Sequence, residues 1–457
     1  MSEPLDIDRW QRALVYGFGT SGRAAARLLL TRGVEVVVVD RREPEKLDLG
    51  ELESESRVQW LLGNEPTAVP AGVDGVVLSP GVPGDRPLLS DARRRGLPVI
   101  AEVELAFAYA RGPVIAITGS NGKSTTTAMT GAILAAEKVP VSVCGNIGVP
   151  MSESVARAAQ STFVVELSSF QLEATVNFHP RAAALLNVAL DHLDRYAGLA
   201  PYLEAKRRIF LRQEPGDVAV LNADDPLVAA SESAARRRFF SLESMPADGC
   251  GLAGDEVVER SPGGAERLLF KASEVGVSGR HNLENAMAAA LLALAAGARP
   301  ESSREGLARF RGLPHRLERV AEIDGVAWYD DSKGTNPAAT LKSLSGFRPG
   351  SVHLILGGRN KGLSFAELAS AVARQARRVY LIGEASAELE GELAGRVELE
   401  HAHTMANAVA SAARKARAGE VVLLSPACAS FDQYRDFNQR GEHFKRLVRD
   451  LAGALNG

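Results

Sequence analysis

The residues from Thr118 to Thr125, TGSNGKST, are the part of the chain whose types and spacing point most directly to chemistry. They follow a short apolar run, Pro113 to Ile117, and open a stretch rich in threonine and alanine. A glycine-containing turn at a helix start offers backbone N–H groups and the positive end of the helix dipole to phosphate oxygens. Lys123 would add a positive charge for the outer phosphates, and Ser124 a hydroxyl that can hold Mg²⁺. The pattern predicts a nucleoside triphosphate site of shortened form, since Ile117 stands where a Walker A sequence needs its first glycine.

A second glycine-rich turn, GFGTSG, spans Gly17 to Gly22 and follows the apolar run Ala13 to Tyr16. Asp40 comes directly after the next such run, Val34 to Val39, as in the dinucleotide-binding fingerprint. The turn could bind NAD, bind another nucleotide diphosphate, or carry no ligand, because both ligands offer a pyrophosphate to the helix N-terminus. The triphosphate loop further along the chain, and the turn SPGV at Ser79 to Val82, favour ATP used together with a nucleotide-linked substrate.

Two polar residues are expected beside the triphosphate loop. The run STFVVE predicts a strand that ends in Glu166, and AAALLNVALDHLDRY predicts one that ends near Asp191 and His192. The carboxyl ends of parallel strands line one crevice, so Glu166 and His192 should lie close to Lys123. A carboxylate and an imidazole near phosphates are suitable Mg²⁺ ligands. Each alone could equally be a solvated strand-end carboxylate or a helix-capping histidine, but the shared edge favours a metal site.

The order of the elements predicts the fold class. Short β-branched runs alternate with alanine- and leucine-rich stretches, which is typical of α/β domains with mainly parallel sheets. We place three domains, at residues 1–102, 103–312 and 313–457. Within the second domain we expect turns or a hairpin in Pro246–Gly264, and within the third we expect strands at Val352–Leu356, Val379–Ile382 and Glu420–Leu424.

Composition narrows the class of protein and its partners. The 457 residues carry a net charge of −3 without a long basic block, so we expect no nucleic-acid partner. No apolar run reaches the ~20 residues that span a bilayer, and the acidic start MSEPLDIDRW is unlike a secretory signal. The three cysteines, Cys144, Cys250 and Cys428, have neither disulfide-framework nor zinc-site spacing. We therefore expect a cytoplasmic protein without a membrane span.

Across essentially its whole length the chain resembles the Mur ligase family. The motifs that carry the resemblance are TGSNGKST, GNIG (Gly145–Gly148), ELSSFQLE (Glu166–Glu173), NVALDHLDRY (Asn187–Tyr196), YLEAKRRIF (Tyr202–Phe210), HNLEN (His281–Asn285), GLPHRLE (Gly312–Glu318), DDSKGTN (Asp330–Asn336), LGGRNKG (Leu356–Gly362) and SPACASFDQYRDF (Ser425–Phe437). ELSSFQLE, DDSKGTN and SPACAS are typical of the members that add glutamate. The DNPR-type segment of the members that add a diamino acid is absent, and LGGRNKG occupies its region.

The resemblance implies a fold and a reaction. The fold would have a Rossmann-like N-terminal domain that binds a UDP-sugar, a central P-loop-type ATPase domain with a mainly parallel sheet, and a Rossmann-like C-terminal domain that binds an amino acid. ATP would phosphorylate the terminal carboxylate of UDP-N-acetylmuramoyl-L-alanine, and the amino group of D-glutamate would then attack the acyl phosphate. The cofactors implied are ATP, two Mg²⁺ ions and CO₂ as a lysine carbamate, and we expect a monomer.

The resemblance also implies roles for individual residues. Lys206 would be carbamylated, which turns an ammonium without acceptors into an anion that can ligate Mg²⁺. Metal ligands would be Ser124, Glu166, His192 and carbamylated Lys206, and the catalytic set would be Lys123, Glu166, His192, Lys206 and Lys333. ATP would be bound by Gly119, Asn121, Gly122, Lys123, Ser124, Thr125, Asn282, Asn285, Arg316 and Asp331. The UDP-sugar would be bound by Gly19, Thr20, Ser21, Asp40, Arg41, Ser79 and Asn146. The amino acid would be bound by Thr335, Lys361, Ser430, Phe431 and Phe437, with Phe431 at a position where the best-known members have leucine.

Three alternatives stay open at this stage. The nearest is another Mur ligase, such as the member that adds L-alanine. An NAD-dependent oxidoreductase with an accessory ATPase domain would show cofactor absorbance and no dependence on an amino acid. A nucleotide-gated binding protein would release phosphate from ATP without any amine acceptor.

Overall fold

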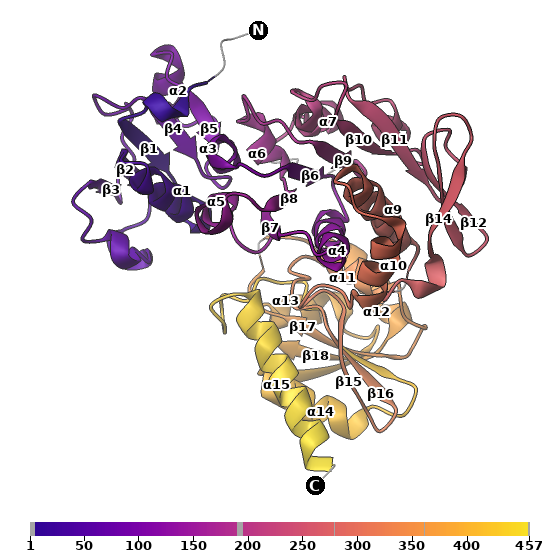
Figure 1. Ribbon diagram of the computed structural model, residues 1–457. Helices are drawn as coiled ribbons and strands as arrows, with labels where there is room; N and C mark the ends of the chain where they lie inside the picture. Colours follow the sequence, from indigo (N-terminus) through magenta and orange to yellow (C-terminus); the bar gives the residue numbers. More distant parts are fainter. Residues whose placement is uncertain (1–4, 190–194, 278, 361, 456–457) are drawn as a thin grey trace. The chain divides into compact units, whose positions relative to one another are not determined.

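Parallel sheets organise the chain in the computed structural model, which describes residues 5–189, 195–277, 279–360 and 362–455 (Figure 1). The chain divides into two units, Met1–Phe310 and Arg311–Gly457. The first unit contains two sheets and the second contains one. The predicted α/β class with mainly parallel strands is confirmed, while the exact borders of the three predicted domains stay a prediction.

The first sheet has five parallel strands in the order β3-β2-β1-β4-β5. The strands are β1 (Arg12–Tyr16), β2 (Glu35–Asp40), β3 (Val58–Leu62), β4 (Gly75–Leu78) and β5 (Val99–Ala101). The helices of this region are α1 (Thr20–Thr31), α2 (Pro87–Arg94) and α3 (Glu102–Tyr109), with short 3₁₀ turns at Ile7–Arg9, Pro44–Lys46 and Gly50–Leu52. The strand order reverses between β1 and β4, and ligands of open α/β sheets bind at such a point. The turns GFGTSG and SPGV follow these two strands and therefore lie at that point.

The second sheet has nine strands in the order β14-β13-β12-β11-β10-β9-β6-β8-β7. They are β6 (Val114–Thr118), β7 (Val141–Gly145), β8 (Thr162–Glu166), β9 (Ala182–Leu185), β10 (Val218–Asn222), β11 (Arg236–Ser241), β12 (Gly249–Ala253), β13 (Glu256–Arg260) and β14 (Glu266–Lys271). Among the described strands of this sheet, only the pairs β12–β13 and β13–β14 are antiparallel, and β12–β13 is the hairpin expected in this region. The helices are α4 (Lys123–Ala136), α5 (Met151–Ala158), α6 (Ser169–Glu173), α7 (Leu199–Arg207), α8 (Pro226–Ala229), α9 (Arg280–Ala295) and α10 (Pro300–Arg309), with 3₁₀ turns at Arg208–Phe210 and Ala272–Glu274.

The centre of this sheet explains where the triphosphate loop lies. All five residues of β6 are buried, as expected for a parallel strand covered on both faces. Helix α4 leaves the end of β6 and packs against α9 and α10, which lie side by side with it in Figure 1. The loop before α4 is thus fixed between a buried strand and a packed helix.

One predicted element is wrong in length. We expected a strand ending near Asp191 and His192, but β9 ends at Leu185. Beyond it the backbone leaves the ladder, because the Asn187 carbonyl accepts a hydrogen bond from the Ser120 N–H at 2.9 Å instead of bonding to a strand. Asp191 and His192 themselves lie outside the described residues.

The second unit contains a six-stranded sheet in the order β15-β16-β20-β17-β18-β19, in which β15 alone is antiparallel to its neighbour. The strands are β15 (Glu318–Ile323), β16 (Val326–Asp330), β17 (Val352–Gly357), β18 (Ala376–Ile382), β19 (Glu398–His403) and β20 (Val421–Leu424). The helices are α11 (Pro337–Leu344), α12 (Ala366–Gln375), α13 (Ser386–Leu393), α14 (Met405–Lys415) and α15 (Phe437–Leu455). The three strands predicted in this region are confirmed, with β18 beginning three residues earlier than expected.

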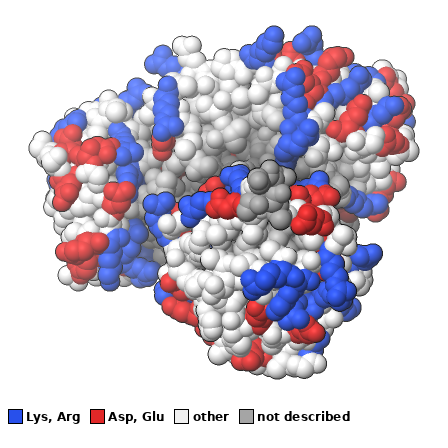
Figure 2. Space-filling model, turned by 90° about the horizontal axis from the view of Figure 1, so that it is seen from below, with Lys and Arg blue, Asp and Glu red and all other residues white. Residues whose placement is uncertain are grey.

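The surface carries charges of both signs. Basic and acidic side chains are interspersed over the face drawn in Figure 2, in line with the small net charge of −3. Among the described helices, none combines the length and the apolar character that a membrane crossing requires.

Candidate active site

The triphosphate loop is built by two glycines with unusual backbone angles. Gly119 and Gly122 have φ values of +150° and +82°, and Gly122 is the N-cap of α4. A Cβ atom on Gly122 would lie 2.3 Å from the Asn285 amide oxygen, so only glycine fits this close approach. The predicted strand–loop–helix arrangement is therefore present, with the N–H groups at the start of α4 directed as an anion site requires.

The far side of the loop is held by amide groups. The Asn121 N–H donates to Asn187 Oδ1 at 2.8 Å, and the Asn187 Nδ2 donates back to the Asn121 carbonyl at 3.1 Å. Asn285 on α9 is buried, and its Oδ1 accepts from Thr126 Oγ1 at 3.3 Å. We expected Asn285 near adenine, whereas its position against Gly122 indicates a supporting role for the loop. Asn187 received no role from the sequence, because only its place in a longer motif marked it.

Two lysines from distant parts of the chain converge on this loop. The Lys123 ammonium donates to the carbonyls of Gly119 and Ser120 at 3.0 Å each. The Lys206 ammonium donates to the same Gly119 carbonyl at 2.8 Å. Two positive charges at one carbonyl repel each other, and an anion placed between them would relieve that repulsion. This arrangement brings together two of the predicted catalytic residues.

Lys206 has an unusual environment for a lysine. It lies on α7, its side chain is 1% exposed, and Nζ is 4.3 Å from the centre of the Tyr202 ring. Lysine is rarely buried to this degree without a partner or a function. The Lys206 amine is thus held at the loop by α7, Tyr202 and the Gly119 carbonyl.

Glu166 provides a buried acidic oxygen next to the loop. It ends β8 and is paired in register with Ile117 of β6, one residue before the last residue of that strand. Its side chain is 2% exposed, and Oε1 accepts from Asn146 Nδ2 at 2.9 Å. Among the described residues, no hydrogen-bond donor reaches Oε2. We expected Asn146 at the UDP-sugar, but the structure places its amide on Glu166.

These groups fit a Mg²⁺ ion. An unpartnered buried carboxylate oxygen is costly unless water or a cation satisfies it. The Ser124 hydroxyl at the start of α4 and the Glu166 carboxylate are hard oxygen ligands of the kind that Mg²⁺ takes together with phosphates. The remaining predicted ligand, His192, lies outside the described residues.

The second glycine-rich turn is closed by different contacts. A Cβ atom on Gly22 would lie 1.9 Å from the Gly17 carbonyl oxygen, so the turn cannot form with a larger residue there. The Ser79 hydroxyl donates to the same carbonyl at 2.6 Å, which joins SPGV to GFGTSG as expected. Gly19, Thr20 and Ser21 form the N-terminus of α1 beside this contact.

Asp40 anchors this turn rather than projecting from it. Its carboxylate accepts from the Phe18 N–H at 2.7 Å, and from the Arg42 N–H and guanidinium at 2.9 and 2.7 Å. Burial opposes ionisation, but the hydrogen bonds from Arg42 and Phe18 outweigh it and lower the pKa of Asp40 to about 2. Both oxygens are therefore engaged by the chain itself, whereas we expected them to hold the ligand. Arg41, also expected at the ligand, is exposed.

In the second unit the segment DDSKGTN follows β16. Asp331 is 6% exposed and accepts from the hydroxyls of Ser343 and Ser425 at 2.6 and 2.7 Å, and from the Leu317 N–H at 3.2 Å. Burial raises the pKa of Asp331 to about 6, against the opposing effect of these hydrogen bonds and of Arg316 nearby. We expected this carboxylate at the ATP ribose; the structure makes it the junction of three segments.

Arg440 is a site residue that sequence reasoning missed. Its guanidinium donates to the Ser332 carbonyl at 2.8 Å, to the Ser332 hydroxyl at 3.0 Å and to the Cys428 carbonyl at 3.1 Å. It is 1% exposed, and burial lowers its pKa to about 10. The Ser332 hydroxyl in turn donates to the Phe437 carbonyl, and the Lys333 ammonium lies 5.0 Å from the Phe437 ring centre. No local pattern separates Arg440 from the other arginines of α15.

The residues expected at the amino acid are placed differently from one another. Ser430 is 2% exposed and Phe431 is 62% exposed, and both precede α15. Thr335 follows Lys333, whose carbonyl accepts the Thr335 N–H at 2.8 Å. Lys361 lies outside the described residues. The described members of this set thus lie in or near the segments that follow β16 and β20.

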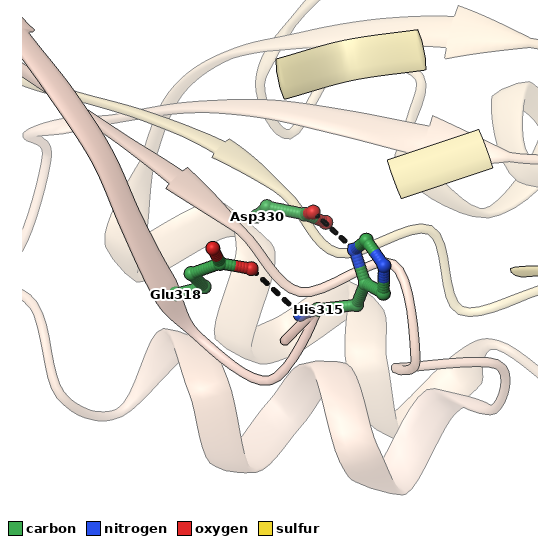
Figure 3. A group of neighbouring side chains, drawn as sticks. All are labelled: His315, Glu318 and Asp330. Atoms are coloured by element: carbon green, nitrogen blue, oxygen red, sulfur yellow. Dashed lines mark hydrogen bonds and ion pairs between the residues drawn. The ribbon is translucent and has the colours of Figure 1, made fainter. Parts of the chain in front are cut away.

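His315, Glu318 and Asp330 form a cluster with metal-ligand residue types (Figure 3). His315 Nδ1 is 2.6 Å from Asp330 Oδ2, and the His315 N–H donates to Glu318 at 2.9 Å. The Lys445 ammonium, however, lies 3.1 Å from Glu318 Oε2 and 2.8 Å from Glu442 Oε1. Lys445 supplies the positive charge that a metal ion would bring, so the cluster is an ion-pair network rather than a cation site.

This network shapes the turn that carries Arg316. His315 and Leu317 have φ values of +61° and +48°, a left-handed conformation that costs energy for residues with a side chain. The His315 carbonyl also accepts from the Lys333 N–H at 3.0 Å. The exposed Arg316 side chain is therefore presented by a turn that neighbouring segments hold in place.

Solved structures share this architecture. The UDP-N-acetylmuramate-alanine ligase of Thermotoga maritima matches with a TM-score of 0.60 at 19% identity, over 96% of this chain and 99% of the other. A MurF structure from Acinetobacter baumannii matches with a TM-score of 0.58 at 20% identity, over 94% and 98%. At such identities the likeness concerns the fold.

Family models and curated relatives give a more specific result. The models "Mur ligase MurD-like, N-terminal domain", "Mur ligase middle domain" and "Mur ligase, glutamate ligase domain" match residues 11–101, 117–293 and 315–428. The UDP-N-acetylmuramoylalanine–D-glutamate ligase of Koribacter versatilis is 43% identical over 452 residues, covering 98% of this chain and 99% of the relative. The protein of the same name from Myxococcus xanthus is 44% identical over 454 residues, covering 96% and 98%. Identity of this degree over nearly the full length of both chains shows that this chain belongs to the Mur ligase family.

Proposed function

We propose that this chain is an ATP-dependent ligase that joins D-glutamate to UDP-N-acetylmuramoyl-L-alanine in the synthesis of peptidoglycan precursors. The observation that carries the proposal is a buried Glu166 oxygen that no donor reaches within the described part of the chain. It lies one strand away from a glycine loop that also holds Lys123. This is what a site for a metal-bound nucleoside triphosphate requires. The relatives that share the full length of the chain carry the name of this activity.

In the first step, an oxygen of the substrate carboxylate attacks the γ-phosphorus of ATP. A new P–O bond forms, the bond to the β–γ bridging oxygen breaks, and ADP leaves with that electron pair. The protein contributes position and charge rather than covalent chemistry. Lys123 neutralises charge on the outer phosphates, and the N–H groups of Gly122, Ser124 and Thr125 cradle them.

In the second step, the amino group of glutamate attacks the carbonyl carbon of the acyl phosphate. The C–N bond forms, the C–O bond to phosphate breaks with its electron pair going to phosphate, and the nitrogen of the attacking neutral amine loses one proton to solvent or phosphate. Lys333 would hold the phosphate as it leaves, while Thr335, Lys361, Ser430, Phe431 and Phe437 would orient the amino acid. Arg316 would bind ATP phosphates, and Asn282 would lie near the base.

Mg²⁺ would be held by Ser124 and Glu166, and a second ion by His192 and carbamylated Lys206. When bound, these ions neutralise phosphate charge and hold the reacting oxygens in line. The proposal of a carbamate is compatible with the contact to the Gly119 carbonyl, since a carbamylated Nζ keeps one N–H to donate to it. The carbamate would also replace one of two neighbouring positive charges with a negative one.

The turn at Gly17–Gly22 would receive the uridine diphosphate at the N-terminus of α1, with Ser79 beside it. Asp40 would act there by holding the turn, and Arg41 by meeting the ligand from the exposed side. We further infer a cytoplasmic protein, because the substrates are small soluble molecules, and a monomer stays our expectation.

The test is release of phosphate from ATP by the purified chain with Mg²⁺ and UDP-N-acetylmuramoyl-L-alanine. Each of D-glutamate, L-glutamate, L-alanine and glycine is supplied in turn, and the product is identified by mass. We expect turnover with D-glutamate alone. Two further reactions replace the substrate by UDP-N-acetylmuramate or omit the amino acid. Turnover of UDP-N-acetylmuramate with L-alanine would favour the alanine-adding activity, and phosphate release without any amine would contradict a ligase.

A further inference from the structure

Between the two glycine-rich loops lies a cation that the proposed mechanism does not use. This cation is Arg195, which follows residues 190–194 and has a side chain that is 21% exposed. Ser79, Pro80 and Val82 from the first region and Phe170 and Gln171 from the second surround it, around a gap too small to hold a water molecule. A Cβ atom on Gly84 would lie 4.0 Å from Arg195 Nη2, so the arginine lies directly beside the loop after β4.

The guanidinium of Arg195 is held in one orientation. Its central carbon lies 4.1 Å from the centre of the Phe170 ring, and its Nη2 donates to Glu173 Oε2 at 2.5 Å. The other oxygen of Glu173 accepts from the Tyr196 hydroxyl. Stacking on a ring and one fixed hydrogen bond pre-organise the planar fork, which reduces the entropy lost when its other N–H groups bind a ligand.

A row of aromatic rings connects Arg195 to the triphosphate loop. The Phe170 ring is stacked on Tyr196 at 6.0 Å, and Tyr196 contacts Tyr202 at 5.2 Å. Tyr202 lies under the Lys206 ammonium, which contacts Gly119. In the other direction, Ser79 borders the gap beside Arg195 and its hydroxyl donates to the Gly17 carbonyl. Arg195 therefore lies between the loop that would hold a diphosphate and the loop that would hold ATP.

We infer that Arg195 is a substrate-positioning residue, whose guanidinium binds an oxyanion of the nucleotide-linked substrate on its way from the first loop to the second. This inference rests on the proposed function, because the substrate must reach both loops at once. The oxyanion is either a diphosphate oxygen or the carboxylate at the far end of the substrate. A fork that pairs with either anion fixes its direction as well as its charge.

The experiment compares binding of UDP and of UDP-N-acetylmuramoyl-L-alanine to the full chain by titration calorimetry, together with steady-state kinetics. We expect Arg195→Met, which keeps contact with the Phe170 ring, to weaken binding of the full substrate about tenfold, as for loss of a charge-assisted hydrogen bond. The KM for that substrate should rise, while kcat at saturation and the KM for ATP stay within about threefold. Arg195→Lys should recover part of the affinity. If Arg195→Met weakens binding of UDP as much as binding of the full substrate, Arg195 binds the diphosphate. If only binding of the full substrate is weakened, Arg195 binds the carboxylate.

Two control variants separate positioning from structure. Arg157→Met removes the same charge from an exposed pair with Glu153 on α5 and should change nothing. Glu173→Gln removes the partner of Arg195 but leaves the cation, so it should keep substrate affinity within about threefold. Equal losses in Arg195→Met and Glu173→Gln, accompanied by equal losses in melting temperature, would overturn the inference, as would unchanged binding in Arg195→Met. A wild-type chain that binds neither ligand would contradict the proposed function itself.

Discussion

The two glycine-rich turns of the first unit start from the same local plan and differ in what surrounds them. Each follows a buried parallel strand and opens a helix, α1 or α4. The turn at Gly17–Gly22 is closed by a carboxylate, Asp40, and by the Ser79 hydroxyl, and no lysine lies within it. The turn at Gly119–Gly122 is held by amides and receives two lysine ammonium groups.

This difference distinguishes a turn suited to binding a phosphate group from a turn suited to a phosphate group that reacts. A turn anchored by a carboxylate offers its backbone N–H groups and helix dipole to a diphosphate that does not change during the reaction. A turn with lysines and a buried acidic oxygen beside it can stabilise charge that moves during phosphoryl transfer. The same backbone motif thus acquires its chemistry from residues that arrive from other strands and helices.

Loss of the loop lysine should have the largest effect. We expect Lys123→Ala to reduce turnover at least about 100-fold, since removal of one transition-state donor costs roughly 3 kcal/mol or more. The measurement is phosphate release under saturating substrates, with the melting temperature as a control for folding. Calorimetry should show unchanged UDP binding, because that ligand belongs to the other turn. An equal loss of UDP binding would contradict the assignment of separate ligands to the two turns.

The second expected effect concerns the buried lysine of α7. If Lys206 is carbamylated, Lys206→Ala should be nearly inactive and partly rescued by acetate, which can supply an anion in the vacated space. Lys206→Arg should not be rescued, because arginine keeps its positive charge and fills that space. The readout is phosphate release with and without acetate, with sodium chloride at equal ionic strength as the control. Wild-type activity in Lys206→Arg would refute the carbamate.

Two glycine variants test whether the first turn depends on the close contact at Gly22. Gly22→Ala places a methyl group against the Gly17 carbonyl and should cost about 1–3 kcal/mol of stability. It should also weaken UDP binding at least about tenfold. Gly19→Ala meets no atom within 4 Å, so its unfolding free energy should stay within about 0.5 kcal/mol of wild type. Urea unfolding and calorimetry test both; equal behaviour of the two variants would contradict the described turn.

The smallest effect depends on pH. The pKa of Asp40 is lowered to about 2 in the folded chain, so its contribution to stability is present above its ordinary pKa of 3.8 and is lost as pH falls toward 2. Asp40→Asn should therefore cost on the order of 2 kcal/mol at pH 7 and progressively less below pH 4. Urea unfolding at pH 7, 5 and 3 measures the difference. Asn187→Ala is the contrasting variant: neither the amide nor alanine titrates, so its cost should not change over this pH range. A difference between Asp40→Asn and wild type that stays constant with pH would count against the anchoring role.

Local sequence predicted much of the fold because its main signals are local. Buried parallel strands such as β6 are almost entirely apolar, and Gly17, Gly119 and Gly122 adopt backbone angles that other residues avoid. The order of strands and loops then placed Glu166 beside Lys123 without knowledge of the structure. These are properties of short segments and of a general rule about sheet edges.

The supporting contacts could not be predicted in the same way. Asp331 reads as a ligand-facing carboxylate, but it bonds to Ser343 and Ser425 from two other segments. Arg440 and Asn187 act on backbone groups far away in sequence, and such pairings follow from tertiary packing. The early end of β9 has the same origin, since the Asn187 carbonyl bonds to the loop instead of to a strand. Sequence patterns therefore predicted the residues of the candidate site better than the tertiary contacts that support those residues.

The position of Arg440 in the chain has a consequence for biosynthesis. Arg440 lies 108 residues after Ser332, whose carbonyl it holds. At typical rates of translation, the DDSKGTN segment is made about 5–20 s before the helix that secures it. During this interval the first unit can already fold, while the Ser332 carbonyl still lacks its guanidinium partner. The nascent second unit is therefore expected to be a substrate for chaperones and proteases until α15 emerges from the ribosome.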